Sequence, residues 1–209
     1  MPSIYHLKPR FQTLLRPITQ KLAEFGVTAN QVTVAALLMS GAVGACMTLF
    51  PQSRWPLLLL PPFLLARMAL NAIDGMLARE HDMKSHLGIM LNEVGDVLAD
   101  AALYLPFGLV VGVQPDLVVV IVVLAIISEV TGIVAVQVCG ERRYDGPLGK
   151  SDRAFLFGGL GLLLGCGVSP GMWVDGLLGV AVLLLALTIV NRARHALAQT
   201  NSGSSKDSA

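Results

Sequence analysis

The sequence predicts an all-α integral membrane protein with six transmembrane helices and an N-terminal amphipathic helix at the membrane interface. Of its 209 residues, 54% are hydrophobic, and the mean hydropathy of +0.68 is too high for a soluble domain. Apolar runs long enough to cross a bilayer alternate with short polar segments. Lys and Arg collect mainly in alternate polar segments, as they do in polytopic membrane proteins.

Residues 1–28 predict an amphipathic helix that lies in the membrane interface, ahead of a six-helix domain at 29–195. This segment lacks the apolar core of a cleavable signal peptide. Pro17 could kink this interfacial helix, and the alternative is a core-packing helix of a soluble cap. The Ser-rich end, 196–209, predicts a disordered tail. The apolar side chains at helical spacing are Phe11, Leu14, Leu15, Ile18, Leu22 and Phe25, opposite Lys8, Gln12, Arg16 and Lys21.

The apolar runs predict where the spans lie and how they are oriented. Basic residues precede the first span and follow the second, the fourth and the last, whereas the other connections hold only Arg54. The positive-inside rule then puts both termini and the segment 71–96 on the cytoplasmic side. A formal net charge of +1 gives no sign of a nucleic-acid partner. The six spans are expected near 30–50, 55–73, 87–112, 117–139, 154–168 and 173–191.

A polar string between residues 71 and 100 interrupts the apolar sequence and predicts an active site. A charged side chain in hydrocarbon costs several kcal/mol, so these side chains must face water, each other, a metal or a substrate. Helical spacing puts two sets of residues on two faces that could line one polar cavity. The first set is Asn71, Asp74, Gly75, Ala78 and Arg79, and the second is Gly88, Asn92, Asp96 and Asp100.

This string closely resembles the signature of the CDP-alcohol phosphotransferase family, with phosphatidylglycerophosphate-synthase-like members the most similar. The signature reads D-x-x-D-G-x-x-A-R, eight residues, then G-x-x-x-D-x-x-x-D. Asn71 and Asn92 stand where the family has its first and third aspartates. Residues 26–33 also look like the family's P-N-x-x-T element, with Ala29 in place of Pro, although Thr28 and Asn30 are ordinary N-cap candidates as well. The positions that match the signature are Asp74, Gly75, Ala78, Arg79, Gly88 and Asp96.

The resemblance implies a bacterial inner-membrane enzyme of phospholipid biosynthesis. Such an enzyme moves a phosphatidyl or other phospho-alcohol group from a CDP-linked donor, such as CDP-diacylglycerol, to an acceptor hydroxyl and releases CMP. Asp96 would be the general base. Members commonly form homodimers through their later helices, and the run of Gly158, Gly159, Gly161 and Gly165 would permit close helix packing there. By position, the CDP contacts would be Asn71, Asp74, Gly75, Ala78, Arg79 and Gly88.

Metal binding by Mg²⁺ or Mn²⁺ is implied at Asn71, Asp74, Asn92 and Asp96, but only two of these four residues carry charge. Asp100 or Glu93 could supply the missing charge, or the site could hold one ion. A second ion could instead arrive with the donor's pyrophosphate, which is the alternative we favour from sequence.

Basic residues after the fourth span resemble the region that holds the acceptor in members with phosphorylated acceptors. This suits glycerol 3-phosphate or an inositol phosphate, although topology alone also predicts basic residues here. Glu129 is an intramembrane acid that could pair with Lys150, Arg153 or Arg67 or orient the acceptor, and the sequence does not specify its partner. Arg67 is expected either to reach an interface or to pair with an acid. The predicted acceptor contacts are Arg142, Arg143, Lys150 and Arg153.

Two other functions fit parts of the sequence. A relative that binds CDP-lipid without turnover would explain the two asparagines, and a small transporter would explain intramembrane acids. The transporter does not require the D-G-x-x-A-R block. Cys46, Cys139 and Cys166 are predicted to be reduced packing residues.

Overall fold

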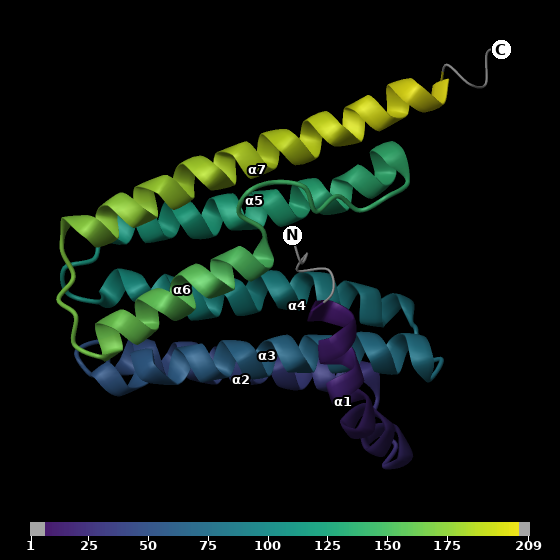
Figure 1. Ribbon diagram of the computed structural model, residues 1–209, viewed down its shortest axis with the longest axis horizontal. Helices are drawn as coiled ribbons and strands as arrows, with labels where there is room; N and C mark the ends of the chain where they lie inside the picture. Colours follow the sequence, from purple (N-terminus) through teal and green to yellow (C-terminus); the bar gives the residue numbers. More distant parts are fainter. Residues whose placement is uncertain (1–6, 205–209) are drawn as a thin grey trace. The chain divides into compact units, whose positions relative to one another are not determined.

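The computed structural model describes residues 7–204, with side-chain environments from 11 to 200, and in this part of the chain helices are joined by loops, without strands (Figure 1). The contacts divide it into two compact units. The first holds α1, α2 up to Cys46, α3 from Leu59 and α4 up to Leu103; the second holds Met47–Leu58 and the described residues from Tyr104 onward. The elements are α1 Leu7–Glu24, α2 Ala29–Leu49, α3 Arg54–Glu80, α4 His86–Tyr104, the 3-10 helix η2 Leu105–Leu109, α5 Pro115–Cys139, α6 Lys150–Gly165 and α7 Met172–Ser204.

Four helices are long and apolar enough to cross a membrane, namely α2, α3, α5 and the part of α7 up to Thr200. The two other predicted spans correspond to α4 and α6, which are not among these four helices. Helix α4 has 19 residues but carries three acids, and α6 has only 16 residues. The predicted span 87–112 is also interrupted after Tyr104, where η2 begins with Pro106 near its start. Proline cannot donate the backbone hydrogen bond that an α-helix needs there.

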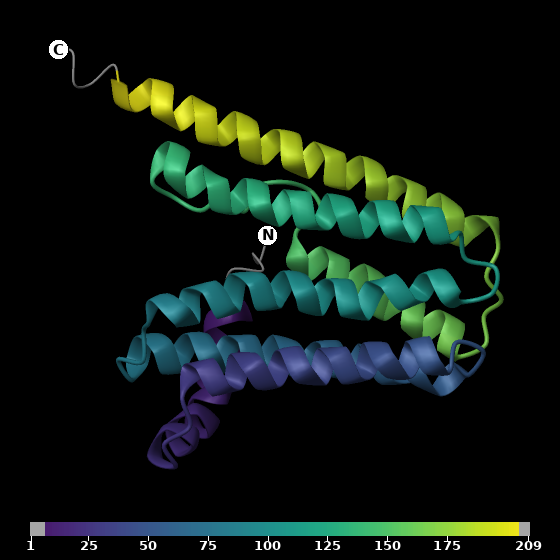
Figure 2. The same ribbon diagram turned by 180° about the vertical axis from the view of Figure 1, so that it is seen from behind.

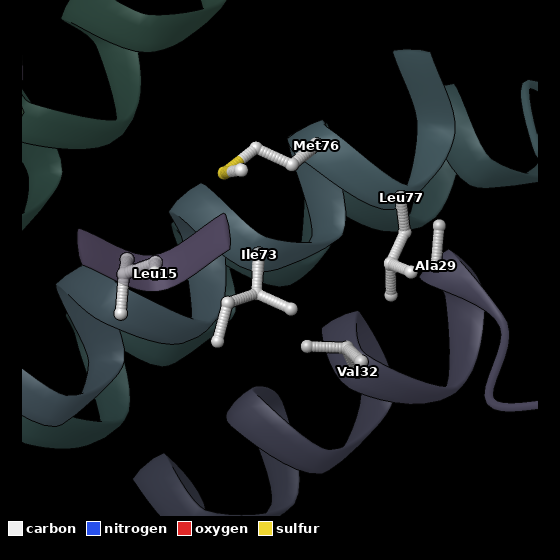
Figure 3. Packing of buried hydrophobic residues seen from close by; sticks show 6 residues of the cluster. All are labelled: Leu15, Ala29, Val32, Ile73, Met76 and Leu77. Carbon is white, nitrogen blue, oxygen red and sulfur yellow. The ribbon is translucent and has the colours of Figure 1, made fainter. Parts of the chain in front are cut away.

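The first unit is held together by an apolar cluster that joins α1, α2 and α3. Figure 3 shows its buried members. The Thr19 hydroxyl of α1 also lies 3.9 Å from the Met76 sulfur of α3. One side of helix α1 therefore packs on a protein core. On the other side, Leu14 and Phe25 are 72% and 83% exposed, which suits a membrane interface. The cluster consists of Leu15, Ala29, Val32, Ile73, Met76 and Leu77.

Helix α2 begins with a reciprocal pair of capping hydrogen bonds. The Gln31 N–H donates to the Thr28 hydroxyl at 3.3 Å, and the Thr28 N–H donates to the Gln31 side-chain oxygen at 2.9 Å. This capping box satisfies two backbone donors at the start of the helix. Thr28 is thus the N-terminal cap that the sequence offered as an alternative to substrate contact.

In the second unit, α5 and α7 lie side by side (Figures 1 and 2). The rings of Tyr104 and Phe157 stack with centroids 4.2 Å apart and fix α6 beside η2. Gly165 is buried against Leu58 of the same chain, so this predicted dimer contact serves internal packing. Helix α7 continues to Ser204. Residues 196–204 of the predicted disordered tail are therefore helical, and 205–209 lie outside the described residues.

All three cysteines are free thiols, as the sequence predicts. Cys46 and Cys139 are half-buried, whereas Cys166 is exposed, so Cys166 is not the packing residue that we expected.

Candidate active site

The first half of the signature lies on one face of α3, as its spacing predicts. The opposite face carries Ile73, Met76 and Leu77, which are buried in the apolar cluster (Figure 3). Packing of that face fixes the rotation of the helix about its axis. Asp74 is 6% exposed, and Arg79 at the end of the helix is exposed. The helix therefore carries a buried acid and, one turn later, an accessible guanidinium.

Asp74 is held by a neighbouring helix. The hydroxyl of Thr33 on α2 donates a hydrogen bond to Asp74 Oδ2 at 2.9 Å. Thr33 is the threonine of the predicted P-N-x-x-T element. A hydrogen bond of this kind restricts the orientation of the carboxyl group. Sequence reasoning named the element but gave Thr33 no role.

Arg67, one turn before Asn71 on α3, joins two acids of α4. Its Nη1 donates to Asp100 Oδ1 at 2.6 Å, and its Nη2 lies 3.4 Å from Asp96 Oδ1 and 3.2 Å from the Asp96 main-chain oxygen. The Arg67 and Asp100 side chains are only 4% and 7% exposed. Asn71 Nδ2 donates to the same Asp96 Oδ1 at 3.2 Å. Arg67 thus pairs with acids, one of the two expectations for it.

Gly75 and Gly88 allow close approach at two points of the signature. A Cβ on Gly75 would lie 3.1 Å from Nη2 of Arg79, so the Arg79 side chain folds back over this glycine. A Cβ on Gly88 would lie 2.6 Å from Asn30 Oδ1, an overlap that real Cβ atoms do not tolerate. Asn30 also donates to the Ser85 hydroxyl at 3.4 Å. The start of α4 is therefore seated against the start of α2.

Asn92 and Glu93 stand half-buried on α4, about one turn before Asp96, and Ala78 is half-buried on α3. Thus the structure brings Asn71 to Asp96 and Thr33 to Asp74. Asp100, which we considered as a source of the missing charge, pairs with Arg67 instead.

The acids of this site do not fit a centre for two metal ions. Among the described residues, no three His, Cys, Asp or Glu side chains come together in a group that could hold a metal. Two divalent ions 3.5–4 Å apart need several carboxylates between them. Here Asp96 and Asp100 are engaged with a guanidinium, and the amide of Asn71 points its donor at Asp96.

A second polar cluster lies in the other unit and centres on Glu129 of α5. Arg142 and Arg153 donate to its two carboxylate oxygens at 3.0 and 3.1 Å, and Arg192 of α7 lies 3.5 Å away. Arg192 also donates to the main-chain oxygen of Ser128. Arg153 is one of the three partners that the sequence left open for Glu129, and Arg192 is a partner that the sequence did not indicate.

Arg143 faces different partners from Arg142. It pairs with Asp145 at 2.8 Å and donates to Gln199 at 3.0 Å, while His195 lies 3.0 Å from Asp145. Burial alone would raise the pKa of Asp145, but the hydrogen bond from His195 and the charge of Arg143 outweigh burial and lower that pKa below its usual value. Of the predicted acceptor contacts, Arg142 and Arg153 converge, and Arg143 does not join them. Lys150 begins α6.

Comparison with known proteins gives a consistent family. The sequence profile of the CDP-alcohol phosphatidyltransferase family matches residues 26–191. The chain is 44% identical over 197 residues to the inner membrane protein YnbA of Escherichia coli (strain K12), covering 93% of this chain and 96% of that protein. It is 28% identical over 200 residues to the phosphatidylinositol phosphate synthase of Mycolicibacterium smegmatis, covering 91% and 85%.

Solved structures share the fold. Crystal structures of Mycobacterium tuberculosis phosphatidylinositol phosphate synthase (PgsA1) are similar to this chain at 20% sequence identity. The structure with CDP-DAG bound gives a TM-score of 0.71 and covers 86% of this chain and 92% of that one. The structure in complex with manganese and citrate gives 0.70 and covers 87% of each.

Proposed function

Because the chain belongs to the CDP-alcohol phosphatidyltransferase family, we propose that it is a transferase acting on a CDP-linked lipid such as CDP-diacylglycerol. It moves the phosphatidyl group to the hydroxyl of an alcohol and releases CMP. The observation that carries this proposal is the arrangement on α3 and α4, where Asp74 and Arg79 lie on one helix and Asp96 is hydrogen-bonded across to Asn71. The CDP-DAG-bound relative supports the donor class.

The retained carboxylates and Arg79 have roles in the proposed reaction. Asp96 takes the proton of the acceptor hydroxyl as its oxygen bonds to the lipid-linked phosphorus, and the bond from that phosphorus to CMP breaks. Arg79 contacts the pyrophosphate, where a guanidinium stabilises developing negative charge. Gly75 and Ala78 leave room for the cytidine beside the flexible Arg79 side chain, whereas the space at Gly88 is taken by Asn30. Asp74 would hold a divalent ion, Mg²⁺ or the Mn²⁺ present in a relative's structure, and this ion would neutralise pyrophosphate charge.

For the acceptor, we propose a phosphorylated alcohol. Arg142, Arg153 and Arg192 surround one carboxylate, Glu129, so these four side chains carry a formal charge of +2. Guanidinium groups suit phosphate because they present several donors in a plane. With Lys150 at the start of α6, this cluster favours glycerol 3-phosphate or an inositol phosphate. The phosphatidylinositol phosphate synthase among the relatives supports this class.

We place the protein in the bacterial inner membrane with six spans. In this arrangement α4 and α6 cross the membrane in addition to the four long apolar helices. The inner membrane relative supports this location. Both termini and the signature then face the cytoplasm, as the positive-inside rule predicts, and CDP-lipid headgroups reach the site from that side. A homodimer through the later helices remains part of the proposal.

A second candidate is a protein that binds CDP-lipid without turnover. The observation that favours it is the engagement of Asp96 with both Arg67 and Asn71, since these contacts occupy one of the two carboxylate oxygens that could take the acceptor's proton.

One assay separates these candidates. Purified protein is incubated with radiolabelled CDP-diacylglycerol, Mn²⁺ or Mg²⁺, and alcohols with and without phosphate. Transfer predicts CMP and a labelled lipid in equal amounts, only when an acceptor is present. CDP-lipid binding without CMP release supports the second candidate, and absence of both contradicts the proposed function.

A further inference from the structure

The buried guanidinium of Arg67 occupies an unusual place, between the two halves of the signature. It contacts Asp100 at 2.6 Å and Asp96 at 3.4 Å, and it is 4% exposed. An ionised side chain at this depth is costly unless acids compensate it. The same holds for the carboxylates of Asp96 and Asp100, which need a cation nearby. Arg67 supplies that cation from within the chain.

We propose that Arg67 takes the place of a second divalent cation, so that this site binds one metal ion per chain. The proposal rests on the proposed function and specifies its metal content. Asp96 and Asp100 contact the guanidinium, and Asp74 lies on the same helix as Arg67, so these four side chains carry a formal charge of −2. That charge balances one divalent ion, and although the donor's pyrophosphate would add negative charge, the Arg67 guanidinium already occupies the position beside Asp96 and Asp100 where a second ion would need its ligands.

The asparagines at 71 and 92 follow from the same charge balance. Asn71 donates a hydrogen bond to Asp96 Oδ1 at 3.2 Å. An aspartate at 71 would put a second carboxylate against that oxygen, and like charges this close repel unless a cation lies between them. Asn92 stands one helical turn before Asp96 on α4, where another carboxylate would add to the same repulsion. With Arg67 as the fixed cation, neutral amides are the side chains that suit both positions.

Mn²⁺ binding tests the proposal without relying on turnover. Mn²⁺ is titrated into purified protein, alone and with saturating CDP-diacylglycerol, and bound ions are counted by equilibrium dialysis. Electron paramagnetic resonance detects spin coupling between ions held 3.5–4 Å apart. We expect one Mn²⁺ per chain with the lipid, at most one without it, and no spin coupling. Two coupled ions in either condition, or none in both, would overturn the proposal.

The variant Arg67→Gln/Asn71→Asp/Asn92→Asp removes the guanidinium and restores the acids. We expect it to bind two spin-coupled Mn²⁺ ions, even without nucleotide, while Arg67→Lys keeps one. Arg16→Gln is the matched control, because it removes the same charge from an exposed pair with Glu80. A folded triple variant that still binds one ion contradicts the proposal. If it does not fold, the wild-type count decides alone.

Failure of the proposed function is distinguishable from failure of this inference. A protein that neither binds CDP-diacylglycerol nor releases CMP is not a transferase. The comparison of nucleotide-free wild type with the triple variant still decides whether Arg67 excludes a second ion.

Discussion

The Thr33 hydroxyl donates a 2.9 Å hydrogen bond to Oδ2 of Asp74, from the second turn of α2 to the signature helix α3. The same hydroxyl lies 3.1 Å from the main-chain oxygen of Ala29, which keeps its rotamer directed along the helix. Asp74 is therefore oriented before any ligand binds. Residues 26–33 serve the site by fixing this acid as well as by capping α2.

Thr33→Val should lower kcat for CMP release about 10- to 100-fold with little change in melting temperature. Valine keeps the shape but loses the hydrogen bond, and a hydrogen bond to a charged group is worth about 1.5–3 kcal/mol. Thr33→Ser keeps the hydroxyl and should restore turnover. Equal kcat in the valine variant would show that Thr33 serves packing alone.

Asp74→Asn and Asp96→Asn should each reduce CMP release by more than about 100-fold in folded protein. Each removes one of the two signature carboxylates that this chain retains, and general base catalysis alone contributes about 10²–10⁴-fold. Asp116→Asn, at an exposed acid in the first turn of α5, is the matched control. Turnover near the wild-type rate in either site variant would contradict the roles assigned to Asp74 and Asp96.

Lys150→Ala and Arg142→Ala should raise the KM for a phosphorylated acceptor about tenfold, with the KM for CDP-diacylglycerol unchanged. Loss of ground-state binding to one substrate has this signature. Lys21→Ala removes a similar charge from α1 and serves as control. If the variants affect phosphorylated and unphosphorylated alcohols equally, these residues serve membrane topology alone.

The signature was predictable from sequence because helical spacing and chemistry both pointed to the same residues. Periodicity put Asn71, Asp74 and Gly75 on one face of α3, and the buried positions of Ile73 and Leu77 on the opposite face are consistent with that register. The partners of buried charges were not predictable. Arg67 pairs with acids 29 and 33 residues away, and periodicity does not specify contacts between helices.

The ends of the elements show a similar limit. Apolar runs indicated α4 and α7, but η2 after Tyr104 depends on Pro106 and the packing of Phe107, and the polar end of α7 continues as helix to Ser204. Hydropathy measures transfer to lipid. It does not register local backbone hydrogen bonding, which determines where each helix ends.

The stability of the second unit should fall at acid pH through Asp145. The pKa of this carboxyl is below its usual value in the folded protein, so its stabilising contribution is present above the unfolded pKa of about 3.9 and is lost as pH falls through the folded pKa. Asp145→Asn should lower the melting temperature at pH 7, and the difference from wild type should shrink as the pH falls below the unfolded pKa. Melting curves from pH 3 to 7 measure this, and a constant difference would contradict it. Asp116→Asn is again the control.

Metal and CDP-lipid should bind cooperatively. The site retains two signature carboxylates, and Arg67 already neutralises part of the charge near Asp96, so a divalent ion finds few acidic ligands until the pyrophosphate arrives. Calorimetry should show weak Mg²⁺ or Mn²⁺ binding alone and at least tenfold tighter binding with CDP-diacylglycerol. Because linkage is reciprocal, metal must tighten the lipid by the same factor. Asn71→Asp/Asn92→Asp should raise metal affinity without lipid and reduce this coupling. Tight metal binding by wild-type protein alone would contradict the prediction, and lipid binding indifferent to metal would favour a protein that binds CDP-lipid without turnover.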